Sequence, residues 1–250
     1  MSSLKIANQL DEELSSLPLE SRIQTIAERF SSPVFTTSLG MEDQVVTWAI
    51  ASHGRSIKIV TLQTGRLFAE TQDLIATTNK LYDIAIEEYD PKPSDIENYA
   101  ETYGMDGFYE SVEARKACCH IRKIVPLNKA LENTDAWITG LRREQSLNRT
   151  STPMAEWDEI RQIMKFNPIA DWTTSDVKEA IAAHDIPVNP LHNRNYPSIG
   201  CEPCTRAIKP GEPERAGRWW WEQEGSQECG LHPTQQTAPS AAQQTSGHDA

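Results

Sequence analysis

The sequence predicts a single α/β domain built on a parallel sheet. Short β-rich runs alternate with amphipathic helical patterns through much of the chain, which is typical of parallel strands joined by crossover helices. The 250 residues, 38% of them hydrophobic, suffice for one sizeable core without a second domain. Three of the predicted strands also end in small polar turns at one edge of the sheet, and open α/β sheets bind ligands at this carboxyl edge.

The elements are taken in chain order. The apolar residues of 4–10 share one helical face and those of 23–30 share another, so residues 1–30 are expected to be a helical segment packed on the core. Residues 31–210 carry the α/β pattern. Strands are predicted at 33–37, 57–62, 84–86 and 136–139, and helices at 42–51, 67–81, 93–103, 112–131 and 173–183.

The three polar turns are Ser38-Leu-Gly40, Gln63-Thr64-Gly65 and Thr139-Gly140. A glycine between a strand and a helix lets backbone N–H groups approach a phosphate at the helix N-terminus. The turn at Gly40 has this form but matches neither a Walker loop nor Gly-x-Gly-x-x-Gly. A plain helix cap, with Glu42 and Asp43 complementing the helix dipole, is the simpler interpretation of this turn alone.

The cysteine count points to a metal or to thiol chemistry. Five cysteines are an odd number, and the chain begins without the basic and apolar regions of a secretory signal, so structural disulfides are not expected. No apolar run approaches membrane-spanning length. We therefore expect a cytoplasmic protein with no membrane partner.

Four cysteines form two pairs. Cys201 and Cys204 have the Cys-x-x-Cys spacing at which two thiolates bind one metal centre, and the adjacent Cys118 and Cys119 can supply the other two ligands. Adjacent cysteines are awkward on one tetrahedral zinc, so the spacing favours an iron–sulfur cluster over zinc. A buried apolar pair at 118–119 is the third interpretation.

Cys229 stands alone in a polar segment near the C-terminus, before Gly230 and His232. Such a cysteine is accessible to solvent and to partners, as a nucleophile must be, whereas an incidental exposed thiol is an oxidation hazard. We expect residues 211–232 to form an arm that carries this cysteine. Residues 233–250 are poor in apolar side chains and are expected to be a disordered tail.

The charge is distributed unevenly along the chain. A net charge of −12 argues against nucleic-acid binding. Residues 1–110 carry eight Lys or Arg against 18 Asp or Glu, whereas residues 111–218 carry 16 against 14. Guanidinium groups match phosphate and sulfate oxygens, so basic residues gathered near turns and cysteines favour a multiply charged anion. An ordinary solvated surface explains the same charges. The candidates are Lys123, Arg142, Arg143, Arg149, Arg215 and Arg218.

Taken together, these motifs resemble those of the assimilatory adenylyl-sulfate reductases of the iron–sulfur type, with the phosphoadenylyl-sulfate reductases as near relatives. The resemblance runs from about Pro33 to His232. It rests on several separate motifs in the same order, at residues 62–71, 116–123, 138–146, 201–204, 215–222 and 228–232.

The resemblance implies an adenine-nucleotide α-hydrolase-like fold of the PP-loop type. It further implies a 4Fe-4S cluster on Cys118, Cys119, Cys201 and Cys204, with Cys229 as the catalytic nucleophile. The substrate-binding residues that it implies, together with the turns, are Ser38, Gly40, Thr64, Gly65, Lys123, Arg142, Arg143, Arg149, Arg215, Arg218 and His232.

The activity implied is the reduction of adenosine 5'-phosphosulfate to sulfite and AMP for cysteine biosynthesis. It would proceed through a cysteine S-sulfonate, with thioredoxin or a glutaredoxin-like protein as the donor. A reductase of the 3'-phosphorylated nucleotide, or of both nucleotides, is the nearest alternative. A PP-loop enzyme that transfers sulfur to RNA and a non-catalytic redox sensor are the others. The sequence leaves homo-oligomerisation open.

Overall fold

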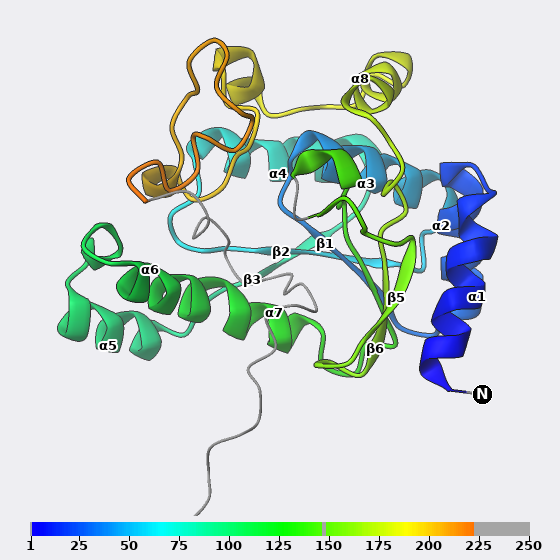
Figure 1. Cartoon of the computed structure of the whole chain (residues 1–250), viewed down its shortest axis with the longest axis horizontal. Coiled ribbons are helices and arrows are strands. Elements are labelled where there is room, and N and C mark those ends of the chain that lie inside the picture. Colours follow the sequence, from blue (N-terminus) through cyan, green and yellow to red (C-terminus); the bar gives the residue numbers. More distant parts are fainter. Residues whose placement is uncertain (1, 147–148, 223–250) are drawn as a thin grey trace, which may run out of the picture.

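The computed structural model describes residues 2–146 and 149–222, and its centre is a six-stranded sheet (Figure 1). The strand order is β3-β2-β1-β4-β6-β5, and every neighbouring pair is parallel except the antiparallel pair β5 and β6. The strands are β1 (Pro33–Thr37), β2 (Lys58–Leu62), β3 (Ile86–Tyr89), β4 (Ala136–Ile138), β5 (Ala155–Asp158) and β6 (Ile163–Phe166).

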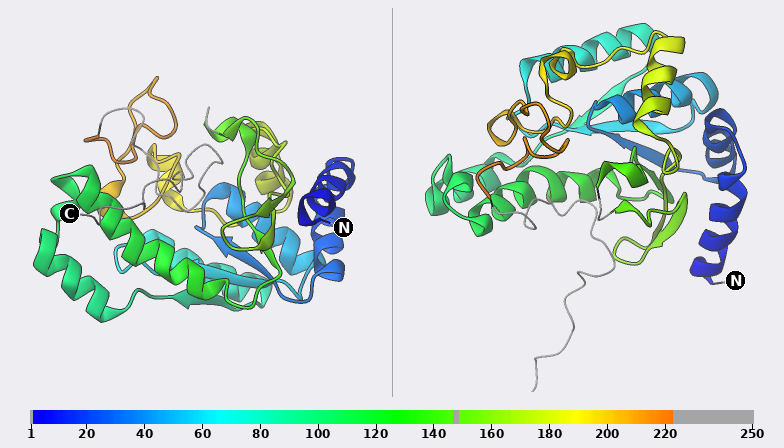
Figure 2. Two further views of the ribbon diagram at one scale, coloured as in Figure 1. Left: turned by 60° about the horizontal axis from the view of Figure 1, so that its bottom comes forward. Right: turned by 45° about the horizontal axis from the view of Figure 1, so that its top comes forward.

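Helices cover both faces of this sheet, as the alternating pattern predicts (Figure 2). They are α1 (Ser3–Ser15), α2 (Leu19–Arg29), α3 (Met41–His53), α4 (Ala69–Tyr82), α5 (Pro93–Tyr103), α6 (Val112–Cys119), α7 (Val125–Ala130) and α8 (Thr174–Ala183). None of the helices within the described residues is long and apolar enough to cross a membrane. The expectation of an α/β domain built on a mostly parallel sheet is confirmed.

Successive residues of the central strands serve opposite cores. In β1, Phe35 packs in the larger cluster with α1, α2, α3 and α8, whereas Val34 packs with Leu127 of α7 on the other face. Trp137 of β4 likewise faces α7, while Ile138 faces α3. Alternation of this kind follows from the period of two along a strand. The sheet is therefore buried on both sides, and its strand ends remain for ligands.

The N-terminal helices are fastened to the sheet by polar contacts. Helix α1 packs against β5, where the Asp11 carboxylate accepts hydrogen bonds from the backbone nitrogens of Met154 and Ala155 at 2.6 and 3.3 Å. Helix α2 packs against α3, and its buried Arg22 forms a two-pronged ion pair with Asp171 at 2.8 and 2.9 Å. Both helices contribute apolar residues to the larger core.

The structure differs from the sequence expectation at three places, two in the sheet and one in a helix. The strand expected at 84–86 begins only at Ile86, because the side chain of Asn79 accepts a hydrogen bond from the Ile86 nitrogen while its carbonyl accepts one from the Ile84 nitrogen. The hairpin of β5 and β6 was not expected. The helix expected at 112–131 is interrupted by a single π-helical turn, His120–Ile124. Such turns often lie at functional sites.

Candidate active site

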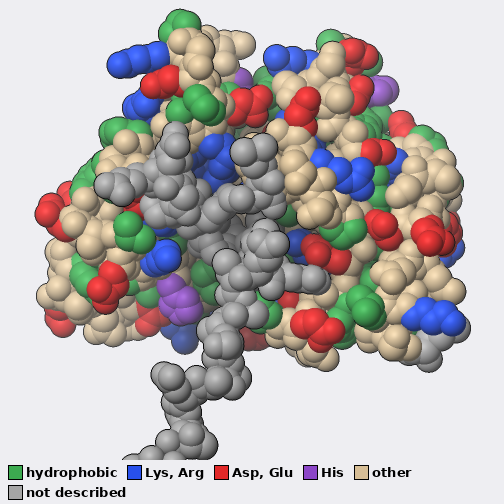
Figure 3. All heavy atoms as spheres, viewed as in Figure 1, with side chains coloured by type: hydrophobic (Ala, Val, Ile, Leu, Met, Phe, Trp, Pro, Cys, Tyr) green, Lys and Arg blue, Asp and Glu red, His purple; other side chains and the backbone are tan. Residues whose placement is uncertain are grey.

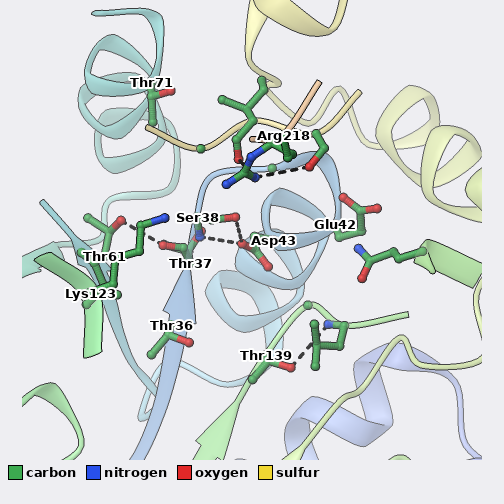
Figure 4. Close-up of a pocket in the computed structure, with 18 of the residues that line it drawn as sticks. Thr36, Thr37, Ser38, Glu42, Asp43, Thr61, Thr71, Lys123, Thr139 and Arg218 are labelled. Carbon is green, nitrogen blue, oxygen red and sulfur yellow. Dashed lines mark hydrogen bonds between the residues drawn. The ribbon is translucent and has the colours of Figure 1, made fainter. Parts of the chain in front are cut away.

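A cavity of about 240 Å³ lies where β1, β2 and β4 end (Figure 4). These strands are adjacent in the order β2-β1-β4: the chain places β2 and β3 on one side of β1 and then crosses to place β4 on the other side. Ligands of open α/β sheets bind at such a switch point. All three turns that the sequence singled out contribute to the lining, through Ser38 and Gly40, Thr64, and Thr139 with Gly140.

Asp43 of α3 fixes the conformation of the first turn through hydrogen bonds to Ser38. The Asp43 carboxylate accepts hydrogen bonds from the backbone nitrogen and the hydroxyl of Ser38 at 2.5 and 2.6 Å (Figure 4). Leu39 takes a left-handed conformation with φ of 59°, and its nitrogen donates to the Thr37 hydroxyl at 3.0 Å. A buried non-glycine residue at positive φ is uncommon and marks a constrained backbone. The turn is thus fixed from within.

Burial raises the pKa of Asp43 to about 6, against the lowering effect of the two Ser38 hydrogen bonds. Gly140 packs directly against the Asp43 carboxyl group. A Cβ at position 140 would lie 2.1 Å from Asp43 Oδ1 and 3.3 Å from the Asp43 nitrogen. Only glycine allows this approach, so the β1 and β4 turns are tightly coupled.

The second turn is held by Arg122, which lies in the π-helical turn. Its guanidinium donates to the Thr64 carbonyl at 2.6 Å. Gly65 follows at φ of 70°, in the left-handed region that favours glycine, and does not line the cavity. The Thr64 hydroxyl does line it and lies 3.3 Å from the Cys201 sulfur. This turn therefore joins the cavity to the cysteines.

Four of the predicted anion-binding cations line the cavity: Lys123, Arg149, Arg215 and Arg218. Arg218 is buried, and its guanidinium bonds the Ile199 carbonyl at 3.2 Å while lying over the Trp219 ring. A Cβ on Gly200 would meet this guanidinium at 2.2 Å, so Gly200 makes its space. The space-filling view shows Lys and Arg side chains near the middle of this face (Figure 3). The cations come from segments far apart in sequence.

The other predicted cations lie elsewhere. Arg142 is buried outside the lining and forms an ion pair with Glu42 at 2.7 Å, which braces a lining carboxylate from behind. Arg143 is also outside the lining and donates to the Thr152 carbonyl at 2.8 Å. Cys229 and His232, with the expected tail at 233–250, lie outside the described residues.

The four paired cysteines gather beside the cavity. Cys118, Cys119, Cys201 and Cys204 are all buried in one cluster with Tyr99, Phe108 and Trp219, and none forms a disulfide. They surround a second space of about 20 Å³. Cys201, Lys123 and Trp219 line both spaces. The cysteine cluster and the larger cavity therefore share a wall.

The electrostatic setting separates Cys201 from the other cysteines. Burial alone would raise the pKa of the Cys201 thiol, but Lys123, the Thr64 hydrogen bond and nearby guanidinium groups bring it below its ordinary value. Burial raises the pKa of Cys204 to about 12 and also raises that of Cys118. Of these three thiols, Cys201, which is on the shared wall, is thus the one most favoured as an anion.

The donor set suits a group larger than one ion. Within residues 2–146 and 149–222, no three or more His, Cys, Asp or Glu side chains converge on a single metal-ion position. A structural zinc needs four ligands around one point, whereas a 4Fe-4S cluster is held by four thiolates. Four buried thiols from two segments, with Arg122 and Lys123 to offset thiolate charge, fit the cluster.

The segment after the cysteines docks through its first tryptophan. Trp219 is 1% exposed, and the guanidinium groups of Arg115 and Arg218 both lie over its ring. Arg115 also forms a fully buried ion pair with Glu222. The segment that ends at residue 222 is therefore anchored against α6, one of the two cysteine-bearing segments.

Sequence reasoning missed several lining residues. Gln145 bonds Arg149 at 2.6 Å, and Glu42 faces the cavity from α3. His192 lines the cavity from a 3-10 helix, Pro190–Arg194, in the proline-rich segment. A lone histidine among prolines carries no local signal of a site. For Glu42, the turn after β1 was a signal, but helix capping explained it equally well.

Comparison with known proteins agrees with this geometry. The model of the phosphoadenosine phosphosulfate reductase domain matches residues 32–207. An adenosine 5'-phosphosulfate reductase of Agrobacterium fabrum is 57% identical, the match covering 93% of this chain and 90% of the relative. One of Rhizobium meliloti is 59% identical, covering 89% and 84%.

Solved structures support the same fold. A phosphoadenylyl-sulfate reductase from Candida auris, in a phosphate complex, has a TM-score of 0.71 at 24% identity and covers 83% of this chain and 98% of its own. An FMN adenylyltransferase of Candida glabrata shares the fold at a TM-score of 0.51 and 11% identity, covering 90% and 85%. With a domain match over most of its length and relatives above half identity, this chain belongs to the phosphoadenosine phosphosulfate reductase family.

Proposed function

We propose that this protein reduces adenosine 5'-phosphosulfate to sulfite and AMP in sulfate assimilation. One observation carries the proposal: the cavity at the sheet edge shares Cys201, Lys123 and Trp219 with the four-cysteine cluster. A nucleotide bound at this edge would place its anionic end beside the cations of the shared wall. The names of the closely similar relatives support adenosine 5'-phosphosulfate as the substrate.

The four lining cations would hold the phosphosulfate group. Lys123 and Arg218 both lower the pKa of Cys201 and so lie at the cysteine end of the cavity. Arg149 lowers the pKa of Asp43 and so lies near the turn after β1. Two or more guanidinium groups can neutralise adjacent phosphate and sulfate oxygens. This lowers the repulsion that an anionic nucleophile meets. Arg142 and Arg143 would support the site through the turns that they brace, and His232 would contribute from the C-terminal segment.

Cys118, Cys119, Cys201 and Cys204 would hold a 4Fe-4S cluster. When bound, such a group fixes two distant segments and supplies a local charge that tunes neighbouring residues. The residues of this chain do the remaining work. Lys123 faces both the cluster site and the cavity, and Arg122 fixes the turn at Thr64.

Cys229 would be the nucleophile. Its thiolate attacks the sulfur of the sulfate group, an S–S bond forms, and the S–O bond to the phosphate breaks, so AMP leaves with the electron pair. The product is an S-sulfonate on Cys229. A thiolate of thioredoxin or a glutaredoxin-like protein then attacks the Cys229 sulfur, sulfite leaves with the electron pair of the broken S–S bond, and the donor's second thiol resolves the mixed disulfide. The dithiol supplies the two electrons.

The chain would divide according to these roles. Residues 31–210 would bind the nucleotide and the cluster, with residues 1–30 packed on them. Residues 211–232 would form the arm that carries Cys229, anchored by Trp219 and Glu222. Thiol chemistry of this kind needs a reducing compartment, so we place the reaction in the cytoplasm.

Replacing Cys229 by Ser tests the proposal. The variant should release no sulfite from adenosine 5'-phosphosulfate with thioredoxin, while keeping the iron content and the visible absorbance of the wild type purified without oxygen. Without thioredoxin, the wild type should retain covalent ³⁵S from labelled substrate and the variant should not. Unchanged sulfite release by the variant would refute the role of Cys229.

The second candidate substrate is the 3'-phosphorylated nucleotide, after which the matching family, phosphoadenosine phosphosulfate reductase, is named. Comparing kcat/KM for both nucleotides on the same preparation decides between them. We expect the nucleotide without the 3'-phosphate to be preferred. A preference for the 3'-phosphorylated substrate would reverse the assignment.

A further inference from the structure

His192 is fixed at the cavity wall by its own loop. The 3-10 helix that carries it is capped by Asn189, whose side-chain oxygen accepts from the Leu191 nitrogen at 3.0 Å. The amide of the buried Asn189 donates to the Thr71 hydroxyl of α4 at 2.9 Å. Tyr196 closes the loop by donating its nitrogen to the Leu191 carbonyl. The imidazole ring is thus held in a definite position.

The hydrogen bond at Nδ1 defines the tautomer of His192. Nδ1 lies 2.8 Å from the Tyr196 carbonyl oxygen, which can only accept, so Nδ1 carries the proton. Burial lowers the pKa of His192, against the opposing effects of the Tyr196 carbonyl and of Glu42. The ring is therefore neutral at pH 7, and its Nε2 is a hydrogen-bond acceptor.

This acceptor has no donor in the described part of the chain. Nε2 is buried, and within residues 2–146 and 149–222 no hydrogen-bond partner reaches it. A buried polar atom without a partner costs about 1–3 kcal/mol. His192 is one of the residues that line the cavity, so a ligand bound in the cavity is the candidate source of the missing donor.

We propose that Nε2 of His192 accepts a hydrogen bond from a ribose hydroxyl of the bound nucleotide, an inference that rests on the proposed function. A neutral acceptor cannot serve a phosphate or sulfate oxygen, which also accepts. Glu42 is a second acceptor in the lining, and its charge raises the pKa of His192, so the two side chains lie near each other. Figure 4 shows Glu42 and Lys123 on opposite sides of Ser38. Two acceptors away from Lys123 suit a pair of hydroxyls rather than an anion.

Two substitutions separate the acceptor from the structural bond. His192→Asn keeps an amide N–H where Nδ1 donates to Tyr196 and removes the acceptor at the ε position. His192→Gln restores an amide oxygen near the ε position. Both variants are made in the full chain, purified without oxygen, and checked by circular dichroism and iron content.

The probes are AMP, 2'-deoxy-AMP, 3'-deoxy-AMP and IMP, with dissociation constants measured by calorimetry. We expect the Asn variant to bind AMP about 5–30-fold more weakly than the wild type. For one of the two deoxynucleotides, the Asn variant and the wild type should bind equally, because the hydroxyl that pairs with Nε2 is already missing. The Gln variant should recover the discrimination between AMP and that deoxynucleotide.

Two results would overturn the inference alone. One is an equal loss of affinity for all four nucleotides in the Asn variant, which indicates a structural role. The other is a loss that vanishes with IMP instead of a deoxynucleotide, which assigns the donor to the adenine amino group. If none of the four nucleotides binds the wild-type protein, the proposed function fails, and this inference fails with it.

Discussion

Gly140 and Asp43 make the closest approach between two turns of the cavity, and Gly140→Ala tests what this approach contributes. The new Cβ would lie 2.1 Å from Asp43 Oδ1, more than 1 Å inside a normal carbon–oxygen contact of roughly 3.3 Å. The backbone leaves little room, because Asp43 lies in the first turn of α3 and its nitrogen is itself only 3.3 Å from the new atom. The carboxylate must therefore move.

Moving the carboxylate breaks its two hydrogen bonds to Ser38, at 2.5 and 2.6 Å. Overpacking costs about 1–3 kcal/mol, and each buried group left without a partner costs a similar amount. We expect the free energy of unfolding to fall by about 2–4 kcal/mol. For a chain of this size this lowers Tm by about 4–16 °C. Affinity for AMP should fall as well, because Ser38 is released.

Gly40→Ala is the matched control in the same cavity. A Cβ there would lie 3.6 Å from the Ser38 hydroxyl, an ordinary contact, and the backbone φ of −67° suits any residue. Its cost should be about 1 kcal/mol or less, which is the difference between two cap residues. Thermal unfolding followed by circular dichroism compares the two variants.

A double-mutant cycle makes the test specific. In an Asp43→Ala background the obstructing carboxyl group is absent, so Gly140→Ala should cost much less than it does in the wild type. Equal Tm values for Gly140→Ala and Gly40→Ala would refute the reasoning. A full cost that persists without the Asp43 carboxyl group would refute it too.

Three further predictions concern charge. Because burial raises the pKa of Asp43 from 3.8 to about 6, its stability contribution is full below pH 3.8 and is lost as pH rises through 6. The wild type should thus lose on the order of 3 kcal/mol relative to Asp43→Asn between pH 4 and 7 in urea titrations; parallel profiles would contradict this. Glu222→Ala should destabilise the fold by about 3 kcal/mol in the same assay, because it removes the buried carboxylate that forms an ion pair with buried Arg115; an unchanged midpoint would contradict this. Arg218→Ala should raise KM at least about tenfold, because Arg218 lines the cavity. The control Arg206→Ala removes a surface ion pair and should raise KM less than about twofold. Equal effects on KM would argue against Arg218 as a ligand contact.

The strands of the nucleotide site follow closely from the sequence. Val34 and Phe35 lie in a short apolar run that a glycine turn ends, and both the strand and the turn depend on local preferences. The β5 and β6 hairpin was missed for a physical reason. Lys165 interrupts its apolar pattern, yet Lys165 is buried because it pairs with Glu156 across the strands at 2.7 Å. A partner on another strand has no local signature.

The candidate site could be predicted where its residues belong to short sequence motifs. The cysteine pairs and the turns at Gly40 and Gly140 fall into this class. The sequence motifs do not show which of Arg142 and Arg218 faces the cavity. That depends on the fold, in which Arg142 pairs with Glu42 and Arg218 packs against Gly200. His192 is similar, since its missing donor is defined by the fold and not by its neighbours in sequence.

The contact of α1 with β5 also bears on how this protein behaves among copies of itself. A free strand edge is a template for pairing with another chain. Asp11 occupies the backbone N–H groups of Met154 and Ala155, and α1 lies against the strand. At the other edge, β3 carries the charges of Glu87 and Glu88. One edge is therefore covered and the other charged, so the N-terminal helix protects a reductase sheet against aggregation as well as completing its core.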